Sequence, residues 1–203
     1  MFLVDADTPG FSTGARTELH GWHTTHHAEL ILDGVEVPAE RLLGSPGNAL
    51  PTFSQVPEMP IGLAACFVGL ARRCYDYALR YTQERVSWGR PIIEHQAVGL
   101  KLADMAVELE TARLLVWRAA AAVDSDPMAA ATVLGPAAKS HAVDVAINVS
   151  RRAVELLGGY GVAREYPVGG WHADALVGYA CDFTRDMLRL GMVPFLAQAS
   201  PSR

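Results

Sequence analysis

The stretch Arg85-Val86-Ser87-Trp88-Gly89-Arg90-Pro91-Ile92, followed by Glu94-His95-Gln96, is the most informative part of this 203-residue chain. Further along lies the glycine-rich segment Leu157-Gly158-Gly159-Tyr160-Gly161. Either feature alone has an ordinary explanation, because a lone arginine is usually a solvated charge and a Gly-Gly pair usually ends a helix. Whether these two features form a functional site depends on the rest of the sequence.

Apolar residues recur at helical spacing on both sides of that stretch. Asp124-Ser125-Asp126-Pro127 interrupts this pattern, and Pro127 suits the first turn of a new helix. The four expected helices span about residues 57–79, 95–123, 127–158 and 171–196. Long helices joined by short links predict an antiparallel four-helix bundle, so the expected fold class is mainly α.

The first 50 residues differ from the rest, with short apolar runs that end at turns. Phe2-Leu3-Val4, Glu29-Leu30-Ile31-Leu32 and Val35-Glu36-Val37 are typical of strands. Two or three strands cannot close a sheet alone, so this segment needs a partner layer. We therefore expect an incomplete β-domain at residues 1–50 and a helical domain at residues 51–203.

Composition excludes several classes of protein. The net charge of −5 argues against a nucleic-acid partner, which would require a basic face. Apolar runs of about 18 residues without charges do not occur, so we expect no membrane span. The three cysteines are odd in number and widely spaced, which favours the reducing cytoplasm over a disulfide framework. No signal peptide is evident at the N-terminus.

Four histidines, His20, His23, His26 and His27, fall within eight residues. Imidazoles in such a cluster could bind Zn²⁺ or Ni²⁺. No carboxylate or cysteine lies beside them at the spacing of a metal motif. We therefore expect no metal site.

Taken together, the two glycine-containing motifs resemble those of the acyl-CoA dehydrogenase family, which are flavin enzymes. Leu102-Ala103-Asp104-Met105 and Glu165-Tyr166-Pro167 also stand at the family's spacing. The resemblance places Met1 to Gly44 at the end of the family's middle β-domain. It places residues from about 50 onward in the C-terminal four-helix domain that binds FAD and forms oligomers.

The resemblance implies FAD as the cofactor. Arg85 matches the arginine that binds the FAD pyrophosphate, and Glu155 stands where the family has a glutamine. A carboxylate there loses two hydrogen-bond donors and adds repulsion near phosphate. The implied FAD contacts are Arg85, Ser87, Trp88, Gln96, Gly158, Gly159 and Thr184.

Asp182 is the implied catalytic base. In the family, a glutamate within Tyr-Glu-Gly-Thr removes the α-proton of an acyl-CoA, and the corresponding run here is Cys181-Asp182-Phe183-Thr184. Aspartate is one methylene shorter, a loss of about 1.5 Å of reach. Two interpretations remain open: Asp182 is a surrogate base, as an aspartate is in the related nitroalkane oxidase, or it is an inert residue that caps a helix.

Other departures from the family pattern lie nearby. Pro60 stands where many members have an arginine, and Glu58 lies one residue away from an alternative base position. One residue turns a helical side chain by about 100°, which disfavours Glu58 as the base. Val168-Gly169-Gly170-Trp171-His172-Ala173 also lacks charges that the family usually has.

Four hypotheses about function follow from the resemblance. The first is a flavoprotein that dehydrogenates an acyl-CoA or acyl-carrier thioester, forms homo- or hetero-oligomers and passes electrons to an electron-transfer flavoprotein. The second is a non-catalytic subunit of a hetero-oligomeric acyl-CoA dehydrogenase. The third is a truncated product, because Met1 falls inside what should be a β-domain. The fourth is a flavin oxidase related to nitroalkane oxidase, with Asp182 as its base.

Overall fold

The computed structural model describes residues 1–49, 56 and 58–198. The chain divides into two compact units, Met1–Val56 and Pro57–Arg203. The domain boundary expected at residues 50 and 51 lies outside the described residues, so the division into 1–50 and 51–203 stays a prediction.

The first unit contains an antiparallel strand pair, β1 (Phe11–Thr17) and β2 (His27–Leu32), with Phe11 opposite Leu32. The strand expected at 29–32 is confirmed within β2. The strand expected at 35–37 is wrong, and Phe2 makes only one isolated bridge, to Leu42. The sequence pattern missed β1 because its residues, FSTGART, are mostly small and polar and do not alternate.

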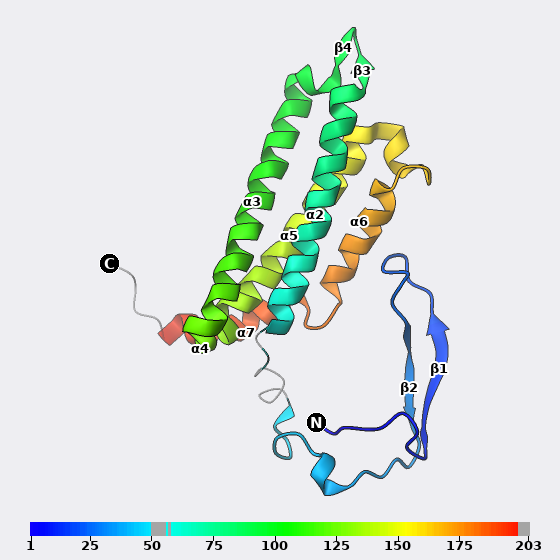
Figure 1. Ribbon diagram of the computed structural model, residues 1–203, viewed down its shortest axis with the longest axis vertical. Helices are drawn as coiled ribbons and strands as arrows, with labels where there is room; N and C mark the ends of the chain where they lie inside the picture. Colours follow the sequence, from blue (N-terminus) through cyan, green and yellow to red (C-terminus); the bar gives the residue numbers. More distant parts are fainter. Residues whose placement is uncertain (50–55, 57, 199–203) are drawn as a thin grey trace. The chain divides into compact units, whose positions relative to one another are not determined.

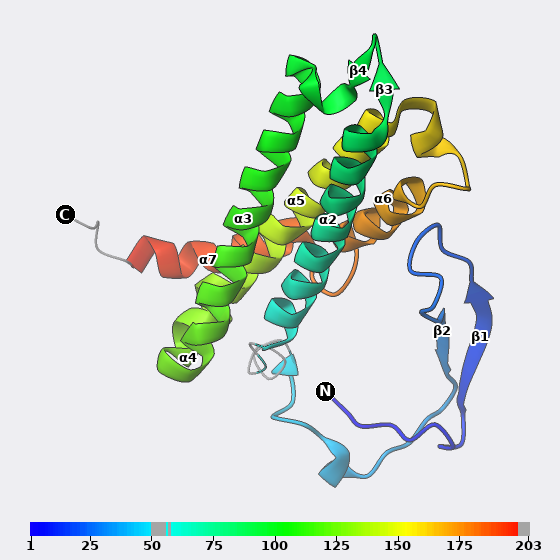
Figure 2. The ribbon, with the colours of Figure 1, turned by 45° about the horizontal axis from the view of Figure 1, so that its top comes forward.

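The second unit is a helical bundle (Figures 1 and 2). Its main helices are α2 (Glu58–Glu84), α3 (Gln96–Ser125), α5 (Gly135–Leu157), α6 (Val168–Leu176) and α7 (Arg185–Gln198). The short helix α4 (Pro127–Ala129) and the π-helical turn η3 (Ala130–Leu134) lead into α5. The mainly α fold class is confirmed, and every described helix is too short or too polar to span a bilayer.

Helix α5 is the centre of the bundle and packs against α2, α3, α6 and α7. Its buried face is made largely of alanine and valine, so neighbouring helix axes can approach closely. Phe67 from α2 and Met105 from α3 fill the space beside it and are fully buried. This packing fixes the two ends of α5, where the candidate site residues gather.

The third expected helix is continuous, as predicted. The Asp126 carboxylate accepts a hydrogen bond of 3.1 Å from the Ala129 amide, and Pro127 lies in the first turn. The helical path then runs through η3 and α5 as far as Leu157.

The fourth expected helix is wrong as one element, because it breaks into α6 and α7. Between them lie the 3-10 turn η5 (Val177–Tyr179) and a loop that carries Asp182 at a φ of 54°. Gly178 packs so tightly that an added Cβ would lie 2.9 Å from both Phe67 and Val143. Packing on the core therefore overrides an apolar pattern that runs through the break.

A small hairpin joins α2 to α3 at one end of the bundle (Figure 1). Its strands are β3 (Val86–Ser87) and β4 (Arg90–Pro91). Trp88 and Gly89 form the turn with φ values of 54° and 79°, as a two-residue type I′ turn requires.

Candidate functional site

A groove of about 600 Å³ lies where this hairpin meets the C-terminal end of α5. The hairpin side contributes Arg85 and Ser87. The α5 side contributes Gly158 and Gly159 from the 3-10 turn η4 (Gly158–Val162), together with Tyr160. The structure thus brings four of the residues assigned to FAD by resemblance into one groove.

Backbone conformation explains the glycines of η4. Gly158 has φ 60° and ψ −133°, a region open almost only to glycine. An added Cβ at Gly158 or Gly159 would meet nothing within 4 Å, so both face open space. At Gly161 an added Cβ would lie 2.3 Å from the Val154 carbonyl oxygen, so close packing excludes a side chain there. The turn therefore presents bare backbone to the groove.

Arg85 is the cationic group of the groove. Its guanidinium carbon lies 5.8 Å from the Tyr160 ring centroid, and within the described residues it forms no ion pair. A guanidinium that is exposed and not neutralised can donate two parallel hydrogen bonds to a diphosphate.

Three tyrosines form the aromatic wall next to Arg85, and sequence reasoning missed this role. The rings of Tyr160 and Tyr166 lie 4.9 Å apart, and those of Tyr81 and Tyr166 lie 6.5 Å apart, edge to face. Burial raises the pKa of the Tyr81 phenol above its ordinary value, so the phenol stays protonated. The sequence feature that could have predicted this wall is Tyr81, which lies one helical turn before Arg85 and therefore on the same helix face.

Glu155, the departure noted in the sequence, does not leave an isolated negative charge in the groove. Its carboxylate pairs with Lys101 at 3.1 Å and with Arg151 one turn earlier on α5. The hydrogen bond from Lys101 is the main reason that the pKa of Glu155 is lowered. The expected repulsion of phosphate is therefore offset by two cations.

Two other assigned residues lie outside the groove lining. Trp88 stands at the hairpin tip with 94% of its surface exposed. Gln96 is exposed at the first position of α3. The neighbouring His95 stabilises the hairpin through a hydrogen bond of 3.1 Å between its Nε2 and the Ser87 carbonyl.

Asp182 and Thr184 lie near the opposite end of α5, because Asp182 and Phe183 contact Lys139 close to the start of that helix. Asp182 accepts a hydrogen bond of 3.1 Å at Oδ2 from the ammonium of Lys139, near the start of α5. The side chain of Lys139 is only 1% exposed and that of Asp182 is 15% exposed, whereas Asp182 as a whole residue is exposed. Asp182 is thus a shielded carboxylate held by a buried cation.

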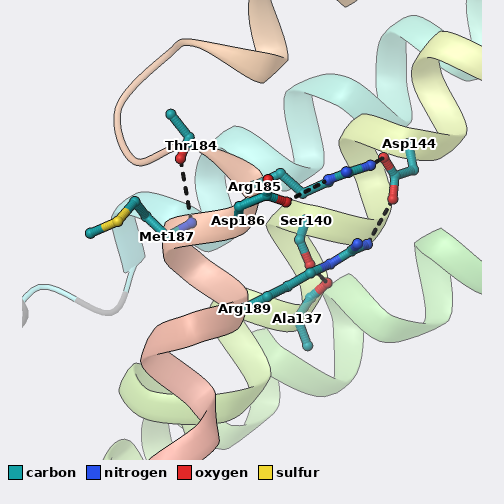
Figure 3. A network of polar contacts seen from close by, with 8 residues as sticks. All are labelled: Ala137, Ser140, Asp144, Thr184, Arg185, Asp186, Met187 and Arg189. Carbon is teal, nitrogen blue, oxygen red and sulfur yellow. Dashed lines mark hydrogen bonds and ion pairs between the residues drawn. The ribbon is translucent and has the colours of Figure 1, made fainter.

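Thr184 caps the last helix. Its hydroxyl accepts a hydrogen bond of 3.3 Å from the Met187 amide, as an N-cap residue does (Figure 3). The interpretation that Asp182 caps this helix is therefore wrong, because Thr184 fills that position and the carboxylate of Asp182 binds Lys139.

Two arginines hold α7 against α5 just beyond this loop (Figure 3). Asp144 accepts hydrogen bonds from Arg185 at 2.9 Å and from Arg189 at 2.7 Å, one on each carboxylate oxygen. The hydrogen bond to Asp144 is the largest cause of the raised pKa of Arg185. The loop that carries Asp182 is therefore anchored to α5 on both sides.

The remaining sequence predictions concern Pro60, Glu58 and the histidines. Pro60 packs beside the backbone of Gly135, where its Cγ lies 3.4 Å from the position of an added Cβ. Glu58 is exposed at the start of α2. Among the residues that the structure describes, no three His, Cys, Asp or Glu side chains are grouped to hold a metal ion.

The geometry fits a dinucleotide cofactor at the hairpin end. The cationic Arg85, the hydroxyl of Ser87, the bare backbone of Gly158 and Gly159 and an aromatic wall are the groups that bind a diphosphate and its attached ring systems. At the other end, Asp182 is a carboxylate that can accept a proton.

Comparison with known proteins agrees with these features. A family profile described as "Acyl-CoA dehydrogenase, C-terminal domain" matches residues 55–192. The short-chain specific acyl-CoA dehydrogenase of Megasphaera elsdenii is 37% identical over 178 residues, which cover 87% of this chain and 46% of that protein. The chain therefore spans about half the length of the curated relatives that it matches.

Solved structures give the same result. Butyryl-CoA dehydrogenase from Megasphaera elsdenii has a TM-score of 0.89 and 33% identity, covering 97% of this chain and 51% of that chain. A chain from a structure of the electron transferring flavoprotein of Acidaminococcus fermentans also has a TM-score of 0.89 and 33% identity, covering 98% of this chain and 52% of that chain. On these sequence and structural matches, this chain belongs to the acyl-CoA dehydrogenase family.

Proposed function

We propose that this chain is the FAD-binding and subunit-forming part of an enzyme that dehydrogenates an acyl thioester between its α and β carbons. The single observation that carries the proposal is the groove that unites Arg85 and Ser87 with Gly158 and Gly159. These residues come from two segments far apart in sequence. Each matches a position at which the family contacts FAD.

Arg85 and Ser87 bind the diphosphate of FAD in this proposal, and the backbone at Gly158 and Gly159 lets the cofactor approach. Trp88 and Gln96 would add contacts from beside the groove, and Thr184, at the other end of α5, would donate a hydrogen bond to the flavin held by the groove of a second copy. When bound, FAD supplies a two-electron acceptor for the hydride that leaves the β-carbon. The chemistry left to this chain is to hold the cofactor and to take the α-proton.

Asp182 is the proposed proton acceptor. Its carboxylate takes the α-proton, the electrons of that C–H bond form the new double bond, and a hydride leaves the β-carbon, so the product is a 2-enoyl thioester. The contact of 3.1 Å with the Lys139 ammonium holds one of its carboxylate oxygens in place. The thioester carrier is CoA or an acyl carrier, and the length of the acyl chain is open.

A second subunit completes the site in this proposal. Lys139, which holds Asp182, and Gly158 lie near opposite ends of α5, about 28 Å apart at about 1.5 Å per residue. The groove and the base of one copy are therefore too far apart to form one compact centre. Exposed apolar side chains recur every seven residues on α3, at Leu100, Val107 and Leu114, as a helix-packing face requires.

The proposed electron acceptor is an electron-transfer flavoprotein. A chain of this fold with 33% identity occurs in a structure of the electron transferring flavoprotein of Acidaminococcus fermentans. An acceptor of this kind would reoxidise the flavin after each turnover.

A second candidate function is a non-catalytic subunit that contributes FAD contacts to a related, active subunit. The short Asp182 is tied back to Lys139, and Phe183 replaces the family's glycine. Pro60, which carries no charge, stands where an arginine is common. These three observations favour loss of proton abstraction with retention of the groove.

The test is turnover of an acyl-CoA panel by the wild type and by Asp182→Ala, with a small nitroalkane as an additional substrate. The proposal predicts flavin reduction by an acyl-CoA in the wild type and its loss in Asp182→Ala. Equal rates in both proteins would contradict the assignment of the base. Activity only when a related full-length subunit is added, unaffected by Asp182→Ala, would support the non-catalytic role.

A further inference from the structure

The buried ammonium of Lys139 has contacts that none of the family motifs accounts for. Its Nζ lies 2.8 Å from the Cys181 carbonyl oxygen, 2.9 Å from the Phe183 carbonyl oxygen and 3.1 Å from Asp182 Oδ2. A lysine ammonium has three N–H donors, so each proton has one acceptor. Three consecutive residues of the loop before α7 thus converge on one cation.

The buried position of the Lys139 ammonium requires that all of its N–H groups find partners. An ammonium that is 1% exposed is stable only when it is paired and fully hydrogen-bonded. Asp182 supplies the negative charge, and the two carbonyl groups supply the remaining acceptors. Lys139 in turn stabilises the positive φ of 54° at Asp182, which is unfavourable for a residue with a side chain.

The contact also sets the orientation of the carboxylate. Oδ2 of Asp182 is engaged by Lys139, whereas Oδ1 has no hydrogen-bond partner among the described residues. Asp144 holds the other side of the loop through Arg185. The carboxylate is therefore fixed at one oxygen, and its second oxygen is left to accept a proton.

We propose that Lys139 is a positioning residue that clamps the loop 181–183 and presents Asp182 Oδ1 to the substrate. The catalytic half of this inference rests on the proposed dehydrogenation. The clamp itself does not, because it predicts the dynamics of the loop whether or not the protein turns over an acyl thioester.

Hydrogen exchange of peptides that cover residues 177–188 tests the clamp without a measurement of enzyme turnover. Replacing Lys139 by methionine should speed amide exchange there about tenfold or more, because the carbonyls and the carboxylate lose their donor. Asp182→Asn should speed it less, because the two carbonyl contacts remain. Asp186→Asn is the matched control, since that carboxylate is exposed and its one ion pair within the described part of the chain is with the adjacent Arg185; it should leave exchange at the wild-type rate.

If Lys139→Met does not fold, the comparison of amide exchange between Asp182→Asn and Asp186→Asn still tests the clamp. Exchange in Asp182→Asn that equals exchange in the wild type would overturn the clamp. A protein without dehydrogenation but with the predicted exchange pattern would leave the clamp supported and the proposed function refuted.

Steady-state kinetics tests the catalytic half. Lys139→Met should lower kcat about 10- to 100-fold with KM nearly unchanged, because a misplaced base slows chemistry rather than binding. In an Asp182→Asn background the same change should have no further effect on kcat. An unchanged kcat in Lys139→Met, or an equal additional loss in the Asp182→Asn background, would overturn the positioning role.

Discussion

At the scale of single residues, the tight packing of Gly178 is what divides the last two helices. An alanine there would place its Cβ 2.9 Å from Phe67 and Val143. We predict that Gly178→Ala lowers the free energy of unfolding by about 1–3 kcal/mol. Gly170→Ala on α6 is the control: its Cβ meets nothing within 4 Å, so this change should stabilise by about 0.5–1 kcal/mol. Urea unfolding of both variants checks the prediction, and equal effects would contradict it.

His172 gives a pH dependence at the same scale. Burial, and then the charge of Arg151, lower its pKa below the usual 6.5, and its Nδ1 lies 2.9 Å from the buried Ser150 hydroxyl. The unfolded chain therefore binds a proton first as the pH falls. The stability contributed by His172 is fully present above pH 6.5 and is lost as the pH falls through the lowered folded value.

We predict that His172→Gln makes stability less dependent on pH below 6.5 than it is in the wild type. Urea unfolding of wild type and variant, at about pH 7.5 and at about pH 5.5, gives the free energy of unfolding of each protein at each pH. The difference in the free energy of unfolding between wild type and variant should be smaller at the lower pH. A difference that is the same at both pH values would refute the assignment of this titration to His172.

At the scale of elements, α7 is attached to the bundle through Asp144. Asp144→Asn weakens the hydrogen bonds to Arg185 and Arg189 together, so α7 should exchange its amides faster and Tm should fall by a few degrees. Asp186→Asn, which removes a carboxylate that is 77% exposed, should change neither. Equal exchange in the two variants would show that apolar packing alone holds α7.

Most of the helical bundle is predictable from the sequence, but two of its boundaries and one strand are not. Helices α2 and α3 and the long path from Pro127 to Leu157 follow from apolar periodicity and the Pro127 signal. The break between α6 and α7 could not be predicted from apolar periodicity, because it depends on the contact between Gly178 and Phe67 in the core. β1 was missed because its polar residues carry no alternation that can be separated from a loop.

The groove was predictable only through the motifs that resemble the family. Arg85 and the Gly158-Gly159 pair are recognisable in the sequence, and the structure places them together. The pairing of Glu155 with Lys101 and of Asp182 with Lys139 was not predictable, because each partner lies on a different segment and carries no motif. Such contacts depend on the packing of α5 against its neighbours.

At the scale of the whole molecule, the proposed subunit contact makes α3 an interface. Val107→Glu together with Leu114→Glu introduces two carboxylates on an exposed apolar face. We predict that this variant sediments as a smaller species than the wild type, with unchanged helix content. Arg72→Glu, a charge change at an exposed position on the different helix α2, should leave the assembly intact. Equal sedimentation of wild type and double variant would contradict an α3 interface.

The visible absorption spectrum after FAD addition and desalting measures whether the Arg85 groove of this chain holds FAD. The wild type and Arg118→Ala should retain the flavin bands, and Arg85→Ala should lose most of them because the diphosphate loses its guanidinium. A wild type that retains no flavin, or an Arg85→Ala variant that retains as much as the wild type, would contradict FAD binding in this groove.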